Sequence, residues 1–465
     1  MSFVNVRLFF LGISLTSRLV VLNIQSAEAP PLEGPVIAVA ISVTDQRQDE
    51  FTWTATDQVG RSGAALPGAT KSVILGLLDS GSGTHLVSYP DALAMGIQGT
   101  FLSEDTFQVS GVDEVDVDLD ISMPTGYFVQ GLQDLDNNGN PQPSLMFGQG
   151  NFAAGVNSFA NFESGIKTPT VIGAPFFISF PVYIRNSQPV QASALGNGIS
   201  SPSVTFYDGP LDPQIPVLAH KIFLETRPTG PTDVTYLPDV NDDLDFFPGS
   251  PSAILSGSLF FTASSMTFHQ GVNTTSGKMV VDTGAQATLI SEIAAAELDL
   301  DLQNPDFEIE VQGLAETIIA PGFYVDSASI PAGGGAVSWT NVPVVVLNVA
   351  SPEGGTLFGI FGSNLTAKRD IVFNGAASTP YLSVTEPIVS PRIKISAIRP
   401  TGPGSAEVDW HAEPAPPVLY LEVCTNLASN PPEWMPVATN DLSTINGTLT
   451  VTGLGPNSFF RLQAP

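Results

Sequence analysis

The chain has 465 residues, enough for about two to four domains and a large core. It carries 16 lysines and arginines against 45 aspartates and glutamates, a formal net charge of −29. This charge excludes the basic face that nucleic acids and anionic membranes require. The single cysteine, Cys424, cannot form an internal disulfide, and no Cys/His spacing of a zinc or iron–sulfur site occurs. We therefore expect no cofactor, no metal and no nucleic-acid partner.

The N-terminal segment, residues 1–29, has the pattern of an export signal. Arg7 precedes an apolar stretch over residues 8–15, and Ala27-Glu28-Ala29 provides the small residues of a cleavage site. Arg18 interrupts the apolar run, and a short N-terminal strand or an interfacial anchor is the alternative. We predict a cleaved signal peptide and a secreted protein. No later stretch approaches the ~20 apolar residues of a membrane-spanning helix, so we expect no membrane span after cleavage.

Short apolar runs rich in Val, Ile and Phe recur between clusters of Gly, Pro, Asn and Asp, which predicts a mostly β protein. The strongest feature of the sequence is an internal repeat. Leu-Leu-Asp-Ser-Gly at residues 77–81 corresponds to Val-Val-Asp-Thr-Gly at residues 280–284, an offset of 203 residues (282 − 79 = 203). Each copy leads into a short predicted helix. Each half later contains an apolar-apolar-Gly segment, ending at Gly173 and at Gly362.

The paired Asp-Ser/Thr-Gly triplets, each with its later apolar-apolar-Gly segment, resemble the two halves of the pepsin-like aspartic peptidases. The second triplet, followed by Thr-Leu-Ile-Ser, also looks like one half of a retroviral-type (retropepsin-like) peptidase. The resemblance covers roughly residues 35–388 and implies a bilobal fold of two related β-barrel-like lobes with the active cleft between them. We predict an N-terminal lobe over residues 30–200 and a C-terminal lobe over residues 201–390. One catalytic aspartate comes from each lobe, Asp79 and Asp282.

Two carboxyl groups within hydrogen-bond reach suit the activation of water. Like charges oppose the ionisation of both, so the pair shares one proton. The ionised member draws a proton from water, and the protonated member polarises the peptide carbonyl and later protonates the leaving amine. Gly81 and Gly284 permit a tight loop that brings backbone N–H groups toward each carboxylate. In the family, the hydroxyls at the positions of Ser80 and Thr283 cross-link the two active-site loops, and the later glycines allow close packing beneath them.

The first lobe departs from the family at the flap, which in pepsin-like enzymes carries a tyrosine. The comparable stretch is residues 121–127, where Thr125 and Gly126 fit but Met123 holds the tyrosine position. Tyr127 is the candidate substitute from a shifted hairpin register, and an ordinary strand aromatic is the alternative. No basic pro-segment precedes the first triplet, so we expect activity without removal of a long pro-peptide.

Two other candidate sites carry weaker signals. Asp134-Leu135-Asp136-Asn137-Asn138-Gly139 begins like a calcium-binding loop, but the twelfth position is Leu145, so we expect a turn. His85 follows Asp79 closely and could suggest a hydrolase pair. No Ser-His-Asp arrangement is readable, and we expect a peripheral loop histidine.

The last segment, residues 391–465, is predicted to form a separate module because short strand-like runs continue after a proline-containing stretch. It resembles the small C-terminal β modules of secreted bacterial proteins, and we expect a β-sandwich-like fold. Trp410, Tyr420 and Trp434 could line a site for a carbohydrate or polymer surface. Such aromatics more often fill a small β core, which is the alternative.

Together these patterns predict a secreted, monomeric aspartic endopeptidase that binds extended polypeptides across its cleft and favours acidic pH. The first alternative is a catalytically inactive protein of the same fold that binds a peptide or another protein. The second is a cell-surface structural β protein in which both triplets are turns. The matched order of the repeated segments favours the peptidase.

Overall fold

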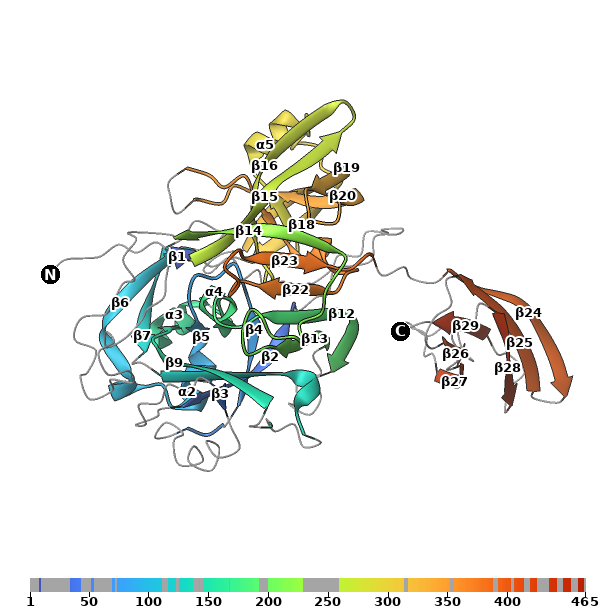
Figure 1. Cartoon of the computed structure of the whole chain (residues 1–465), viewed down its shortest axis with the longest axis horizontal. Helices are drawn as coiled ribbons and strands as arrows, with labels where there is room; N and C mark the ends of the chain where they lie inside the picture. Colours follow the sequence, from blue (N-terminus) through green and yellow to red (C-terminus); the bar gives the residue numbers. More distant parts are fainter. Residues whose placement is uncertain are drawn as a thin grey trace. The chain divides into compact units, whose positions relative to one another are not determined.

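The computed structural model describes residues 8–9, 34–42, 52–53, 69–71, 73–110, 116–122, 125–136, 142, 145–166, 168–191, 200–228, 259–312, 317–351, 355–387, 392–402, 405–413, 419–424, 435–440, 446–452 and 459–463. The chain divides into two compact units, Met1–Glu386 and Pro387–Pro465. Strands dominate both of them (Figure 1), so the mostly β prediction is confirmed. Among the described residues, no helix is long and apolar enough to cross a membrane.

Over its described residues, the first unit contains two large sheets (Figure 1). The first sheet comes from the N-terminal half and has the strand order β1 (Leu8–Phe9), β6 (Leu102–Ser110), β7 (Asp116–Ser122), β10 (Gly155–Val156), β5 (Leu86–Val87), β11 (Val171–Ile172), β4 (Ile74–Leu78), β2 (Val36–Ser42), β8 (Thr125–Gly131), β9 (Met146–Phe152) and β3 (Thr52–Trp53). The predicted signal peptide is described only at β1, so its cleavage remains a prediction.

The second sheet has the order β13 (Ser200–Phe206), β12 (Val182–Gln191), β22 (Ile371–Asn374), β23 (Tyr381–Val384), β14 (His220–Pro228), β15 (Leu259–Gln270), β16 (Asn273–Val281), β21 (Gly359–Phe361), β17 (Thr288–Ile290), β20 (Val337–Val346), β19 (Thr317–Ile330) and β18 (Phe307–Gln312). An additional pairing of β15 with β19 closes six strands into a barrel, in the order β15, β16, β21, β17, β20 and β19. Short helices connect the strands: α2 (Tyr89–Met95), α3 (Phe159–Ser164), α4 (Ala174–Phe177), α5 (Glu292–Glu297), η1 (Gly99–Phe101), η2 (Leu132–Asp134) and η6 (Ser363–Leu365).

The two halves repeat the same strand pairing around each Asp-Ser/Thr-Gly triplet. In the first half, β4 runs parallel to β11, β11 antiparallel to β5, and β5 parallel to β10. In the second half, β16 runs parallel to β21, β21 antiparallel to β17, and β17 parallel to β20. The same three pairings occur in the same order in both halves, so the sequence repeat is a structural repeat.

The helix after each triplet begins in the same way. The Ser88 hydroxyl accepts the backbone N–H of Asp91 at the start of α2, and the Ser291 hydroxyl accepts that of Ala294 at the start of α5. A serine N-cap satisfies a donor that the first helical turn leaves unpaired and stabilises a helix by about 1 kcal/mol. The predicted short helix is present after each triplet, and a serine at the matched position of the repeat begins it in both halves.

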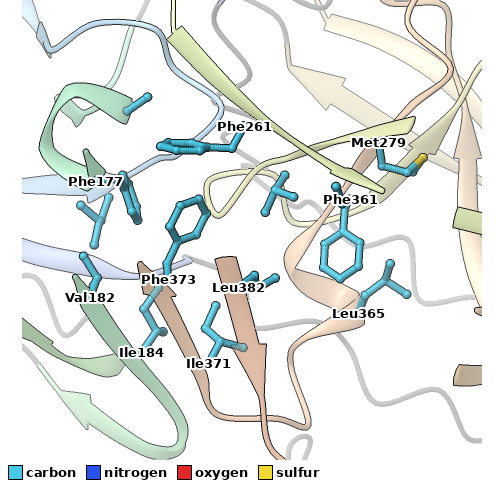
Figure 2. Packing of buried hydrophobic residues seen from close by; sticks show 14 of the residues in the cluster. Phe177, Val182, Ile184, Phe261, Met279, Phe361, Leu365, Ile371, Phe373 and Leu382 are labelled. Atoms are coloured by element: carbon cyan, nitrogen blue, oxygen red, sulfur yellow. The ribbon is translucent and has the colours of Figure 1, made fainter. Parts of the chain in front are cut away.

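A shared core joins the two halves into one unit (Figure 2). Its centre is a group of three phenylalanines, where the ring of Phe373 in β22 lies 4.7 Å from the Phe177 ring and 4.8 Å from the Phe261 ring. Phe177 belongs to the first half and Phe261 to the second. Burial of one such side chain stabilises the folded state by about 1.5–3 kcal/mol. The backbone supports the same junction, since β12 pairs antiparallel with β22.

The second unit contains two three-stranded antiparallel sheets over its described residues. One consists of β24 (Arg392–Gly402), β25 (Ser405–Glu413) and β28 (Asn446–Thr452), the other of β27 (Met435–Asn440), β26 (Leu419–Cys424) and β29 (Phe459–Gln463). Contacts between β27 and β28 and between β24 and β29 pack the sheets together as a small sandwich. Trp410 is buried at 2% exposure and so belongs to the core, not to an exposed polymer site. Trp434 and the side chain of Tyr420 lie outside the described residues.

Candidate active site

Asp79 and Asp282 each follow directly after a buried strand, β4 and β16. The backbone N–H of Asp79 donates to the carbonyl oxygen of Ile172 at 3.0 Å, and that of Asp282 donates to Phe361 at 3.1 Å. Each aspartate is thus held by the strand that carries the later apolar-apolar-Gly segment of its own half. Both side chains are inaccessible to solvent, with 0% and 1% exposure.

One oxygen of each carboxyl group is fixed by the backbone of its own loop. Oδ1 of Asp79 accepts the N–H groups of Gly81 at 2.7 Å and Ser82 at 3.2 Å. Oδ1 of Asp282 accepts those of Gly284 at 2.8 Å and Ala285 at 2.9 Å. The other oxygen, Oδ2, is buried in both and receives no hydrogen bond from an N–H or O–H donor. The carboxyl groups instead lie within hydrogen-bond reach of each other, so one proton can join them.

The glycine of each triplet packs against the carboxyl group of the opposite half. A Cβ added to Gly81 would lie 2.4 Å from Cγ of Asp282, and one added to Gly284 would lie 2.6 Å from Cγ of Asp79. Real Cβ atoms do not approach other atoms this closely. The glycines are therefore required by close approach between the halves as well as by the turn that the sequence predicts.

The hydroxyls after the two aspartates cross-link the loops with near-twofold symmetry. Ser80 Oγ donates to the Val281 carbonyl at 2.8 Å and accepts the N–H of Thr283 at 3.1 Å. Thr283 Oγ1 donates to the Leu78 carbonyl at 2.7 Å and accepts the N–H of Ser80 at 3.0 Å. The arrangement that the resemblance implies for Ser80 and Thr283 is present, and four hydrogen bonds fix the aspartates relative to each other.

The later glycines lie directly beneath the loops. A Cβ on Gly173 would lie 2.2 Å from the carbonyl oxygen of Thr84, and one on Gly362 would lie 2.3 Å from that of Ala287. Ala174 N–H donates to the Ser82 carbonyl and Ser363 N–H to the Ala285 carbonyl, both at 2.7 Å. The backbone of each floor segment therefore contacts the loop above it without an intervening side chain, as predicted.

Burial and the proximity of two acids control the protonation of the pair. Loss of solvation raises the pKa of Asp79, because a buried carboxylate loses the water that stabilises its charge. Burial and the charge of Asp79 raise the pKa of Asp282 well above its usual range. The backbone N–H groups oppose these changes in pKa by stabilising the charged forms. The arrangement favours a pair that holds one proton between two carboxyl groups.

One family of known proteins matches part of the second half of the chain. Residues 269–365, which include the second triplet and its floor segment, match the aspartyl protease family model. This match lies within the second half of the chain. Solved structures that it resembles include an aspartic proteinase from Irpex lacteus, with 13% identity, 78% of this chain and 98% of that one covered, and a TM-score of 0.36. Another is edgp, with 9% identity, coverage of 78% and 96%, and a TM-score of 0.35. No curated protein sequence matched the chain.

The expectation of a peripheral His85 is wrong. The side chain is completely buried, and its Nδ1 accepts the backbone N–H of Gly173 at 3.0 Å. At the matched place in the second half, Thr288 Oγ1 accepts the N–H of Gly362 at 3.3 Å. The repeat offset contained this information, because 85 + 203 = 288 aligns His85 with a threonine that sequence analysis assigned no role.

The predicted flap residues do not form a hairpin tip where the structure describes them. Thr125, Gly126 and Tyr127 are buried in β8, which pairs with β2 on one side and β9 on the other. Tyr127 is 0% exposed, and its ring lies 5.0 Å from that of His85. The strand-aromatic alternative is therefore correct for Tyr127, because an interior strand gives its side chain to the core. Met123 lies outside the described residues.

The described residues contain no group of three or more His, Cys, Asp or Glu side chains that could hold a metal ion. Of the calcium-loop candidate, Asp134 is half-buried at the end of η2, and its carboxyl group accepts a hydrogen bond from Gln133 Nε2 at 2.8 Å. Asn137, Asn138 and Gly139 lie outside the described residues, so this candidate stays a prediction.

Proposed function

We propose that the protein is an aspartic endopeptidase that hydrolyses peptide bonds with water activated by Asp79 and Asp282. The observation that carries this proposal is the pair of buried Oδ2 atoms, which receive no protein donor while both Oδ1 atoms are fixed by backbone N–H groups. Buried polar atoms without partners are rare in folded proteins, and a catalytic role is one of the reasons for which they persist. Here they belong to two acids within hydrogen-bond reach, an arrangement that can activate water for peptide hydrolysis.

In this mechanism, the pair enters the reaction with one proton. The ionised carboxylate takes a proton from a water molecule as its oxygen attacks the peptide carbonyl carbon. The protonated carboxyl group donates to the carbonyl oxygen, and a proton then passes to the leaving nitrogen as the C–N bond breaks. The hydrogen bonds of Ser80 and Thr283 hold the carboxyl groups in place throughout, so little reorganisation is needed in the transition state.

The substrate class that fits is an extended polypeptide, because hydrolysis requires a backbone carbonyl to reach both carboxyl groups. Both are closed to solvent, so the segments that cover them must move to admit a substrate. We also propose, from the pattern of residues 1–29, that the protein is exported and acts as a monomer outside the cytoplasm. The C-terminal unit is proposed as an accessory β module that contacts a surface or polymer.

The test is cleavage of an unfolded protein substrate between pH ~3 and ~7, the range around ordinary carboxyl pKa values. Wild type should cleave, most rapidly at acidic pH where the shared proton is retained. D79N and D282N should each lower kcat by about 10²–10⁴-fold, the usual contribution of general acid–base catalysis. A statine-type inhibitor should abolish the wild-type activity.

D301N is the matched control, because Asp301 is an exposed aspartate of the same half as Asp282, and its carboxyl group accepts hydrogen bonds from Gln303 and Asn304. Its activity should equal that of wild type. Equal activity in D79N and wild type would overturn the assignment of the pair. Lack of cleavage by a folded wild type that still binds the inhibitor would favour the catalytically inactive peptide-binding protein.

A further inference from the structure

His85 is a buried titratable group that the proposed hydrolysis does not use. It lies six residues after Asp79 and is 0% exposed. Its Nδ1 is 3.0 Å from the backbone nitrogen of Gly173. Since a backbone N–H can only donate, Nδ1 must be the acceptor and cannot carry a proton. The geometry thus fixes the neutral ring with its proton on Nε2.

Gly173 connects this ring to the Asp79 loop through its two neighbours. The residue before it, Ile172, accepts the backbone N–H of Asp79 at 3.0 Å. The residue after it, Ala174, donates to the carbonyl oxygen of Ser82 at 2.7 Å. A displacement of the glycine therefore moves both contacts that support the loop. Small displacements of catalytic groups are costly, since a misplacement of about 1 Å can reduce rates by ~10²-fold.

The second half performs the same task with a group that does not titrate. Thr288 Oγ1 accepts the Gly362 N–H at 3.3 Å and donates to Asn364 Oδ1 at 2.7 Å. A hydroxyl keeps its acceptor at every pH at which a protein is folded. An imidazole does not, because protonation converts Nδ1 into a donor. Only the first half therefore has a floor that acid can break.

The contact between His85 and Gly173 opposes protonation of Nδ1. The flanking segments Thr125–Gly131 and Val171–Phe177 contain no charged side chain, and the titratable group that faces the ring from β8 is the phenol of Tyr127. Asp79, the nearest acid along the chain, directs its Oδ1 to the N–H groups of its own loop. In an imidazolium, Nδ1 carries a proton and would place a second donor against the Gly173 N–H, which breaks this hydrogen bond.

We propose that His85 is a positioning residue whose neutral ring holds the floor of the Asp79 loop, and that its protonation sets the acid limit of the folded active site. The first part needs no assumption about catalysis. The effect on peptide hydrolysis rests on the proposed function. Acid then acts in two opposed ways: it supplies the proton that the carboxyl pair shares, and it removes the support beneath one member of that pair.

H85N is the decisive variant, because an asparagine amide oxygen can accept from Gly173 in place of Nδ1 but does not titrate. H85T places the residue of the second half at the same position. H269N is the control, since His269 is exposed on β15. Between pH ~7 and ~5, on either side of the ordinary histidine pKa of ~6.5, the melting temperature of wild type and of H269N should fall by roughly 2–4 °C more than that of H85N or H85T.

Ring ¹⁵N spectra of the four histidines provide a readout that needs no peptidase activity. The signals missing from H85N should show the Nε2-protonated form and should not follow an ordinary titration near pH ~6.5. If the protein cleaves peptides, the acid limb of kcat should move to lower pH in H85N, with KM little changed.

An His85 ring that titrates near pH ~6.5 while the fold persists would overturn the proposal. So would identical acid dependence of stability in wild type, H85N and H85T. A protein without peptidase activity would contradict the proposed function, yet the melting and ¹⁵N measurements would still decide the role of His85.

Discussion

In the first half of the site, Asp79 accepts backbone N–H groups from Gly81 and Ser82, and in the second half Asp282 accepts them from Gly284 and Ala285. The two carboxyl groups thus make the same backbone contacts, although Ser82 of the first half corresponds to Ala285 of the second. One layer below, a histidine in the first half replaces a threonine of the second. The comparison teaches that side chains are restricted where backbones approach closely, whereas the position that accepts the N–H of the floor glycine requires only an acceptor.

Farther from the carboxyl groups the strand pairing of the two halves still corresponds. In the second half, β19 pairs with β18, β15 and β20. In the first half, β7 pairs with β6, and β8 pairs with β2 and β9. The structural repeat therefore extends beyond the two triplets, and the two halves differ chiefly in individual side chains.

The largest effect is expected at the triplet glycines, where the halves should be equally intolerant. G81A and G284A each place a Cβ within 2.6 Å of the opposite carboxyl carbon, so the aspartates must move apart. Each variant should reduce kcat/KM by at least about 10²-fold. Cleavage assays and inhibitor binding measure this loss. G271A, a glycine at φ 57 with open space around it, controls for backbone strain and should keep its activity. A large loss of activity in only one of the two variants would show that Gly81 and Gly284 are not equivalent.

A smaller, measurable effect is expected at the cross-linking hydroxyls. S80A leaves the Val281 carbonyl and the Thr283 N–H without their partner, and T283A does the same to the Leu78 carbonyl and the Ser80 N–H. Each unpaired buried group costs about 1–3 kcal/mol, so each variant should lose about 2–4 kcal/mol of unfolding free energy. Denaturant unfolding measures the loss.

T283S and S80T retain the hydroxyl and serve as matched controls that should stay close to wild type. The double variant S80A/T283A should lose less than the sum of the single variants, because both changes affect one network. Strict additivity would show that the two halves of the cross-link act independently.

The symmetry of the carboxyl pair can be sharpened by the pH dependence of stability. The pKa values of Asp79 and Asp282 are raised, chiefly by burial. A raised carboxyl pKa contributes stability that is fully present below the unfolded value of about 3.9 and is lost as the pH rises toward the folded value. D282N cannot ionise at this position and should therefore lose less stability than wild type between pH ~4 and ~7. A tenfold difference in proton affinity between the folded and unfolded states corresponds to about 1.4 kcal/mol.

Urea titrations of wild type, D79N and D282N across this range measure the effect. Asp301 provides a control of opposite sign, because hydrogen bonds from Asn304 and Gln303 lower its pKa. A carboxyl group with a lowered pKa stabilises the folded state when the pH is above its unfolded pKa. D301N should therefore be slightly less stable than wild type at neutral pH, and this difference should disappear as the pH falls. Equal pH dependence of wild type and D282N would contradict the burial of a shared proton.

Much of the site could be predicted from the sequence because the repeat itself records contacts. The triplet glycines appear in both copies because each approaches the carboxyl group of the opposite half, and the floor glycines appear in both because each approaches the loop of its own half. The serines at matched positions each cap the helix of their own half. The burial of His85 was not predicted because its role depends on one acceptor atom for the Gly173 N–H. A histidine and a threonine can both supply that acceptor, but they do not look equivalent in a sequence comparison. The alignment at an offset of 203 residues contained the correct answer (288 − 85 = 203).

The flap was misplaced for a different reason. Residues 121–127 were assigned to the flap because Thr125 and Gly126 fit the family pattern there. In the structure, Gly126 pairs with Ser42 of β2 inside the sheet. Strand partners far away in the sequence decide whether such a segment is an edge, a turn or an interior strand, and a single sequence does not record them.

The smallest effect is expected for Tyr127, and it separates the two assignments of this residue. Burial raises the pKa of Tyr127 to about 12, so its hydroxyl is neutral throughout the range of activity. As a core residue next to His85, Y127F should change the unfolding free energy by about 0.5–1.5 kcal/mol at most and leave kcat and KM unchanged. Y324F, on β19 of the second half, is the matched control. A loss of kcat in Y127F alone, at unchanged stability, would show that the phenol reaches the substrate and would restore it to the flap. Because the ring packs beside His85 inside the sheet, we expect the two variants to be alike, and the asymmetry between the halves to lie in the floor.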